Sequence, residues 1–227
     1  MGRSIIIDGI EITVIRQFNA KSMRLKIDRK TALPVMTIPY FCPLFTAERF
    51  VRSHFVWLTK QLELTPPKTS FQDGMTISVL GQEVTICHAP QKRCGARIEN
   101  GVLYVSGDAA HLHRRVTDFI KEQVRHYAGQ KALEFAALSG VHVKAVAVRD
   151  TVSRWGSCSA NGHLSFCWRL GLAPLFVLDY VIAHEVSHLK EMNHSRPFWK
   201  AVTTLYPDTE IAKKWLTHNG KDLHRFN

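Results

Sequence analysis

The sequence predicts an α+β fold: a mainly β N-terminal region with one helix, followed by helices packed on a small mixed sheet. In the first 108 residues, short apolar runs alternate with turn signals such as Asp8-Gly9, which is typical of strands. From Ala109 onward, apolar residues recur at helical spacing over long stretches. Because 227 residues suffice for two small domains with their own cores, we expect a β-rich domain at residues 1–108 and a second domain at residues 109–227.

Three hairpins and one helix are expected in the first domain. Each hairpin has a glycine in its turn, and glycine permits the left-handed backbone that tight turns need. The helix begins near Thr46, which can cap it, and ends before Pro66-Pro67. The expected hairpins pair residues 5–7 with 10–15, residues 76–80 with 83–86, and residues 97–99 with 102–106, and the expected helix covers residues 46–64.

A further strand in this domain carries a cluster of positive charge. Apolar and charged residues alternate from Met23 to Asp28, which predicts a half-buried strand with its charged face in solvent. We prefer this interpretation to a phosphate-binding strip, because runs of charge are usually solvated faces. The basic members of the cluster are Lys21, Arg24, Lys26, Arg29 and Lys30.

The second domain is expected to begin with one long helix, from His111 to Ser139, which Gly140 ends. A strand at residues 141–149 and another at residues 163–169 follow. Pro174 then opens a helix that is apolar nearly all round, a pattern that indicates burial. One more helix follows His194 and contains Trp199, which we expect to pack against the buried helix.

The buried helix contains the motif His-Glu-x-x-His, formed by His184, Glu185 and His188. Residues four apart return to one helix face, so the two imidazoles can bind one ion. Glu185 stands close enough to take a proton from a water on that ion, and this donor set is typical of catalytic zinc. The alternative is a pair of hydrogen-bonded core histidines, but three titratable groups on a buried helix would each need a partner.

His194, ten residues after His184, is the expected third zinc ligand. Metzincin proteases use the same interval but carry a glycine midway, where this chain has Glu191. We therefore exclude a metzincin and expect the helix to end at Met192-Asn193, since Asn tolerates the left-handed conformation that ends helices. The alternative for His194 is an exposed loop histidine or a cap.

The motif belongs to a longer pattern of residues. The pattern comprises Arg154–Ser159, Trp168–Leu170, Leu172–Pro174, Leu178–Val181, His184-Glu185, His188-Leu189, Asn193–Ser195, Phe198-Trp199, Pro207-Asp208 and Lys214–Leu216, with a looser likeness near Arg24 and Leu80-Gly81. It resembles the YgjP-like metallopeptidase family, which is related to the SprT-like zinc proteases. The chain departs from the family at Ser187, where Ala is usual, and at Phe166-Cys167, where Leu-Asn is frequent; the second departure concerns substrate contacts.

The resemblance implies a zincin-like core and a zinc-dependent metallopeptidase. In that family a metal-activated water hydrolyses the peptide bond with a glutamate as general base, which here is Glu185. The resemblance implies one zinc ion per chain, held by His184, His188 and His194. Its substrate is then a protein or a peptide.

The substrate path is expected beside the motif, by chain order and resemblance. The strand at His163–Trp168 is the candidate edge on which an extended substrate pairs. The loop before it contains Trp155, which we expect to pack beneath the metal helix. The side chains expected along the path are Arg154, Ser157, Cys158 and Tyr206, and the possible donors to the oxyanion are Arg154, Tyr206 and His218.

The formal net charge of +11 permits anionic partners, but it is spread over both expected domains without a basic tail. Any nucleic-acid binding should therefore be weak, non-specific and salt-dependent. Two further functions stay open. One is a metal-dependent nucleotide phosphoanhydride hydrolase, although this chain has no glycine-rich phosphate loop before a helix. The other is a DNA-associated SprT-like protease, although this chain has no zinc-finger spacing that would support DNA binding. No oligomeric state is indicated.

Five cysteines without Cys-x-x-Cys spacing predict reduced, mostly buried thiols in a reducing cytosol. A Cys87–Cys94 disulfide is the less favoured alternative. No apolar run approaches the roughly 20 residues of a membrane span, and the N-terminus lacks the pattern of a signal peptide. We therefore expect a cytoplasmic protein without a membrane partner.

Overall fold

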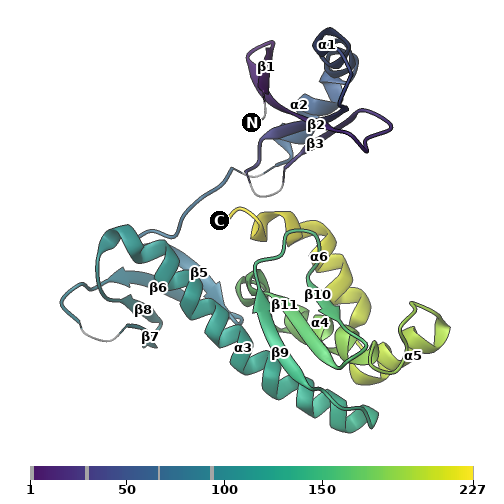
Figure 1. Cartoon of the computed structure of the whole chain (residues 1–227). Helices are drawn as coiled ribbons and strands as arrows, with labels where there is room; N and C mark the ends of the chain where they lie inside the picture. The colour runs from purple at the N-terminus through teal and green to yellow at the C-terminus, as the bar shows by residue number, and fades with distance from the viewer. Residues whose placement is uncertain (1–2, 29–30, 66, 93–94, 227) are drawn as a thin grey trace. The chain divides into compact units, whose positions relative to one another are not determined.

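The computed structural model describes residues 3–28, 31–65, 67–92 and 95–226 (Figure 1). Within these residues it contains six α-helices and three small sheets, so the α+β class is confirmed. The chain divides into two compact units, residues 1–69 (unit 1) and residues 70–226 (unit 2).

The division between the units lies at Thr69/Ser70, whereas the sequence pattern placed it at 108/109. The reason is a shared core. Ile77, Val84 and Leu103 come from the strands before residue 108, and they are buried in one cluster with Val116 and Ile120 from the long helix after it. Those strands bury their apolar side chains against that helix, so strands and helix share one hydrophobic core and form part of unit 2.

Unit 1 is a four-stranded sheet with two helices on one face. Asp8 and Gly9, both with positive φ (48° and 83°), join the first two strands, so that hairpin is confirmed. Ile12, Met36 and Ile38 are fully buried beneath the helices. The strands are β1 Arg3–Ile7, β2 Ile10–Gln17, β3 Arg24–Ile27 and β4 Pro34–Pro39, in the order β1-β2-β4-β3, with β2 and β4 parallel.

The expected helix at residues 46–64 is two helices, α1 Leu44–Ser53 and α2 Phe55–Glu63. His54 separates them with φ −111° and ψ 15°. The Ser53 hydroxyl donates to the Phe50 carbonyl at 2.8 Å, and His54 Nδ1 lies 2.9 Å from the same oxygen. These side chains compete with the helical backbone bond at this carbonyl, which interrupts the helix.

Unit 2 begins with a four-stranded sheet of two hairpins. Leu80-Gly81 and Asn100-Gly101 form the turns, with positive φ at all four residues, and both expected hairpins are confirmed. The two hairpins join through a parallel pair, β6 with β8. The strands are β5 Thr76–Val79, β6 Gln82–His88, β7 Ala96–Glu99 and β8 Val102–Val105, in the order β5-β6-β8-β7.

The long helix α3 covers Leu112–Ser139 and ends at Gly140, whose φ of 66° is left-handed, as expected. It packs against a three-stranded sheet of β9 Ala145–Arg149, β10 Gly156–Cys158 and β11 His163–Cys167. The order is β10-β11-β9, so β11 has a neighbour on both sides and the expectation of an edge strand at His163–Trp168 is wrong. The short 3-10 helix η2 Trp168–Leu172 and three helices complete unit 2: α4 Leu175–Ser187, α5 Arg196–Leu205 and α6 Thr209–Leu223.

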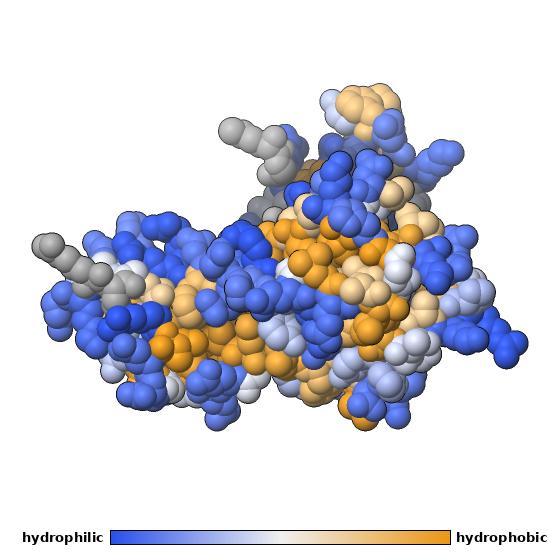
Figure 2. Space-filling model, turned by 90° about the horizontal axis from the view of Figure 1, so that it is seen from below, coloured by the Kyte–Doolittle hydropathy of each residue, from blue (hydrophilic) through white to orange (hydrophobic). Residues whose placement is uncertain are grey.

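Cys42, Cys87, Cys158 and Cys167 are free thiols, and only Cys167 of these four is buried, fewer than expected. Cys94, with the alternative Cys87–Cys94 pairing, lies outside the described residues, as do Arg29 and Lys30. No helix in the described ranges is long and apolar enough to cross a membrane. Figure 2 shows one face of the molecule, on which apolar residues reach the surface between hydrophilic side chains.

Candidate metal centre

Helix α4 is held by burial on nearly every side. Val177, Leu178, Ile182, Ala183 and Val186 are all fully buried. These apolar contacts fix the rotation of the helix about its axis, because each side chain has one place in the core. Its last turn therefore presents the two histidines of the motif in one direction.

The chain leaves α4 at Ser187, not at Met192-Asn193 as the sequence suggested. The Ser187 hydroxyl donates to the Ala183 carbonyl at 2.8 Å. Beyond it, Leu189 N–H bonds to Val186 O and Lys190 N–H bonds to Ser187 O, which tightens the last turn to 3-10 geometry. This tightening turns the chain without a glycine or an asparagine cap.

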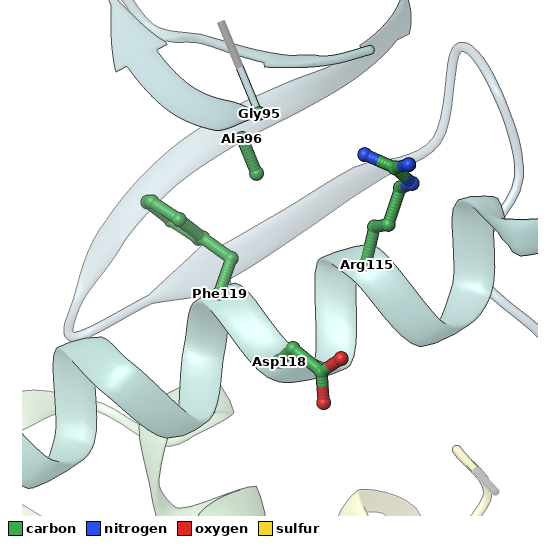
Figure 3. A pocket seen from close by; sticks show the side chains of 5 residues that line it. All are labelled: Gly95, Ala96, Arg115, Asp118 and Phe119. Carbon is green, nitrogen blue, oxygen red and sulfur yellow. The ribbon is translucent and has the colours of Figure 1, made fainter. Parts of the chain in front are cut away.

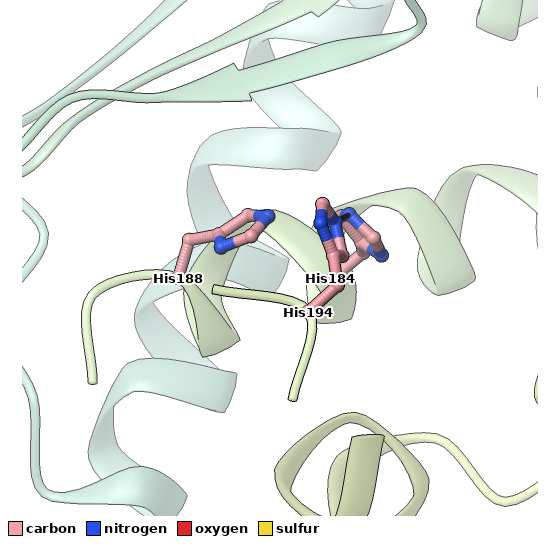
Figure 4. Close-up of side chains that lie close together, drawn as sticks. All are labelled: His184, His188 and His194. Carbon is pink, nitrogen blue, oxygen red and sulfur yellow. Dashed lines mark hydrogen bonds between the residues drawn. The ribbon is translucent and has the colours of Figure 1, made fainter. Parts of the chain in front are cut away.

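His184, His188 and His194 lie together after this turn (Figure 4). One ring nitrogen of each lies within 4.8 Å of the others. The Nε2 atoms of His184 and His194 are 3.1 Å apart. With Zn–N bonds of about 2.0–2.1 Å, two ligands of a tetrahedral ion stand about 3.3 Å apart. The separation of these two nitrogens is therefore close to what one ion requires.

The protonation states of the histidines suit metal binding. His188 Nδ1 lies 3.1 Å from the Glu191 carbonyl, which can only accept, so Nδ1 carries the hydrogen and Nε2 keeps its lone pair. Burial, followed by the two neighbouring histidines and Lys213, lowers the pKa of His184 from 6.5 to about 4. Burial also lowers the pKa of His188. Both rings are neutral at pH 7, the state that metals bind.

Glu185 is buried beside this cluster, with 6% of its surface exposed. Burial raises the pKa of its carboxyl from 4.5 to about 7, and the charge of Arg154 opposes that rise. A carboxyl with this pKa can both accept and release a proton near neutral pH, as a general base must.

Strand β10 runs directly against the Glu185 carboxylate. A Cβ atom placed on Gly156 would lie 2.4 Å from Oε1 of Glu185. Side chains alternate along a strand, so Cys158 shares this face and Ser157 points to the opposite one. Burial, followed by the charge of Glu185, raises the pKa of the Cys158 thiol to about 11, in agreement with that placement.

Strand β10 is an edge strand of its sheet. The Trp155 carbonyl accepts from Cys167 N–H at 2.8 Å, and Ser159 N–H donates to the His163 carbonyl at 3.0 Å. Both bonds point toward β11, and backbone groups alternate in an antiparallel pair. The backbone groups of Gly156 therefore point away from β11, to the edge of the sheet.

The chain matches the family model described as YgjP-like, metallopeptidase domain, over residues 21–219. It belongs to the YgjP-like metallopeptidase family. It is also similar to the solved structure of the metallopeptidase zymogen of Pyrococcus abyssi abylysin, with 20% identity and a TM-score of 0.37, over 40% of this chain and 93% of that chain. Among curated proteins no match was found.

A YgjP-like metallopeptidase is a metal-dependent peptidase, and the residues of this chain fit a metal ion. The donor set is three imidazoles on one side of α4, of which His184 and His188 are held neutral by burial. The tautomer of His188 leaves Nε2 available as a ligand. Three imidazole ligands would leave a fourth tetrahedral position open, which is the arrangement of catalytic metal sites.

The structure separates the predicted oxyanion donors. Arg154 lies near enough to Glu185 for its charge to lower the pKa of that carboxyl. Tyr206 lies near acidic groups: burial, then the charges of Asp179 and Asp208, raise the pKa of its hydroxyl.

His218 and Trp155 both belong to the surroundings of α6. His218 is exposed on α6 and its Nδ1 lies 2.7 Å from the Lys214 carbonyl. Trp155 stacks on His224, with ring centroids 4.8 Å apart, and a Cβ on Gly220 would lie 3.0 Å from it. The Trp155 ring therefore lies beside the C-terminal helix, and it also packs against the core cluster that contains α4; its expected place beneath the metal helix stays a prediction.

Helix α5 places two aromatic side chains beside the three histidines, and the sequence predicts a packing role for only one of them. Phe198 stacks on His188 with ring centroids 4.4 Å apart, and Trp199 lies 5.8 Å from both His184 and His194. Trp199 was expected to pack against α4; the role of Phe198 was missed. Its signal was its place four residues after His194, in the first turn of the next helix.

A separate pocket of about 250 Å³ lies between β7 and α3 (Figure 3). Arg115 and Phe119 point from α3 toward Gly95 and Ala96. Asp118, which also lines it, has ion pairs with two neighbouring cations of α3. None of the motif residues lines this pocket.

Proposed function

We propose that this YgjP-like metallopeptidase is a zinc enzyme that hydrolyses peptide bonds. In the proposal, His184, His188 and His194 hold one zinc ion and Glu185 is the general base. One observation carries it: three imidazoles converge beside a buried carboxyl and the open edge of a strand. A cluster of histidines on an exposed surface would have neither the buried carboxyl nor the strand edge beside it.

Zinc, when bound, supplies a Lewis acid that lowers the pKa of water and polarises a carbonyl group. Glu185 accepts the proton of the attacking water and then passes it to the departing amine. Burial keeps the pKa of this carboxyl well above its usual value in the metal-free protein, which favours its acceptance of a proton. Arg154, whose charge reaches Glu185, is our candidate to stabilise negative charge on the substrate.

The substrate in this proposal is an extended peptide that adds to the open edge of β10. The backbone groups of Gly156 and Cys158 face that edge, so they can pair with the main chain of the substrate. Main-chain pairing does not depend on the substrate's side chains. The absence of a side chain at Gly156 lets the Glu185 carboxylate lie directly against the strand on which the peptide would pair.

The test compares three variants with the wild type for zinc content and for hydrolysis of a denatured protein. Glu185→Gln should retain zinc and lose activity by about 10²- to 10⁴-fold, the range of general-base catalysis. His184→Ala should lose zinc. His126→Ala, a matched change at an exposed histidine of α3, should keep both.

Two results would contradict the proposal: wild-type turnover by Glu185→Gln, or an undiminished zinc content in His184→Ala. The same samples should be tried on nucleoside triphosphates. Chelator-sensitive hydrolysis of these, with none of denatured protein, would favour the nucleotide hydrolase instead.

A further inference from the structure

An exposed aromatic cluster lies at one end of the sheet in unit 1. Strands β2 and β4 run parallel with Gln17 opposite Pro39, so the residues after them, Phe18 and Tyr40, emerge side by side. Their rings are stacked, with centroids 3.8 Å apart and planes 16° from parallel. Phe41 packs edge-on against both rings. We name Phe18, Tyr40 and Phe41 the aromatic cluster.

The aromatic cluster is open to solvent, although its loop is held in place. Phe18 is 73% exposed, Phe41 is 86% exposed and Tyr40 is 42% exposed. Contiguous apolar surface of this kind marks interaction sites. The Arg16 guanidinium donates to the carbonyls of Tyr40 and Cys42, which ties the loop to β2. The rings are therefore presented in a fixed arrangement, which lowers the entropic cost of binding.

Two cations, Lys21 and Arg24, lie at the same end of the sheet as the aromatic cluster. Lys21 lies in the segment between Phe18 and Met23. Phe18 contacts Tyr40 and the Met23 sulfur lies 4.0 Å from the Cys42 sulfur, so both ends of this segment are fixed at this end of the sheet. Arg24 begins β3 at the same end, opposite Thr37. Both cations are exposed, and neither takes part in the ion pairs found in the described ranges.

The acidic residues of the sheet lie at its opposite end. Asp8 forms the β1–β2 turn and Asp28 follows β3. Residues 1–69 contain eleven Lys or Arg and five Asp or Glu, so unit 1 carries a charge of +6 out of +11 for the chain. When the chain is divided at residue 108, its positive charge is spread evenly over the two parts. When it is divided at residue 69, unit 1 has more positive charge per residue than unit 2.

We propose that unit 1 binds single-stranded nucleic acid through the aromatic cluster, with Lys21 and Arg24 on the phosphates. Exposed rings flanked by cations match this partner, because bases stack on aromatic side chains while cations follow the backbone. A duplex fits less well, since its bases are already stacked on one another. The proposal does not depend on the metal centre.

The first experiment measures binding of a fluorescent 15-nucleotide oligothymidine to the full-length protein by anisotropy at low salt. Phe41→Leu keeps an apolar side chain but removes the ring, and should weaken binding by roughly ten-fold, as expected for the loss of one stacked base. Phe41→Trp keeps a ring and should bind as the wild type does. Ile6→Ala, at an apolar residue that is 73% exposed toward the other end of the sheet, is the control.

The second experiment measures how the affinity depends on salt. Log affinity falls with log salt, and the double variant Lys21→Ala, Arg24→Ala should make this fall less steep by about 1.4, or roughly 0.7 for each phosphate contact. The double variant Arg114→Ala, Arg125→Ala removes two exposed cations of α3 in unit 2 and should leave the slope unchanged. Both doubles should unfold at nearly the wild-type temperature.

Several results would overturn the proposal. They are an oligonucleotide that does not bind, equal affinity of wild type and Phe41→Leu, or equal binding of a duplex of the same length. Binding to vesicles of anionic lipid in place of the oligonucleotide would assign the aromatic cluster to a membrane surface.

Discussion

Replacing Gly156 by alanine tests whether β10 sets the place of the Glu185 carboxylate. The φ of Gly156 is not positive, so alanine fits the backbone conformation there. The added methyl, however, would lie 2.4 Å from Oε1 and 2.8 Å from Cδ of Glu185. The methyl and the carboxylate cannot both occupy their places.

The displacement can be estimated from these distances. Ordinary contacts of a Cβ atom begin near 3.4 Å, so the carboxylate must move by about 1 Å. Cγ of Glu185 would also lie 2.7 Å from the methyl, so the whole side chain must change its rotamer and take the carboxylate with it. A misplacement of about 1 Å in a reacting group lowers turnover by about 100-fold, or about 2.7 kcal/mol of barrier.

The assay is kcat for a denatured protein substrate, with zinc content and thermal unfolding measured on the same samples. Gly156→Ala should keep its zinc, because the three histidines are untouched, and should unfold within a few degrees of the wild type. Gly129→Ala is the matched control, since a Cβ there meets nothing within 4 Å. It should stabilise α3 by about 1 kcal/mol and leave kcat unchanged.

The reasoning fails if Gly156→Ala retains full kcat with a normal unfolding temperature. That result would mean that Glu185 works from another rotamer than the one described, or that it is not the base. A loss of zinc together with activity would place the damage in the metal ligands and not in the carboxylate.

Three further predictions concern other features. Cys158→Phe should lower turnover, because that side chain faces Glu185, whereas Ser157→Phe on the opposite face should leave it nearly unchanged; kcat/KM of both variants is the measurement. In the metal-free protein, the pKa of Glu185 is raised from 4.5 to about 7, so its contribution to stability falls as pH rises through this window. Glu185→Gln should therefore gain up to about 3 kcal/mol over wild type between about pH 5 and about pH 8 in urea unfolding. Tyr127→Phe removes the hydroxyl that donates to Asp179 at 2.7 Å, and should cost about 1–3 kcal/mol in the same assay.

Features that depend on neighbouring residues in the chain were determined by the sequence alone. Asp8-Gly9 and Asn100-Gly101 specify hairpin turns because both residues of each pair tolerate positive φ. Gly140 ends α3 for the same reason. The four-residue spacing of His184 and His188 places both rings on one side of α4 wherever that helix packs. The family pattern follows from the same local run of residues.

Features that depend on residues far apart in the chain were decided only by the tertiary structure. Nothing in the composition near residue 108 reveals that β5–β8 bury their side chains against α3. Strand order likewise follows from long-range pairing, so the open edge beside Glu185 is β10 and not β11. That the charge of Arg154 acts on Glu185, and that of Asp179 on Tyr206, follows from how α4 packs against its neighbours. Local spacing encodes the metal ligands, whereas the surface that a substrate meets is made by packing.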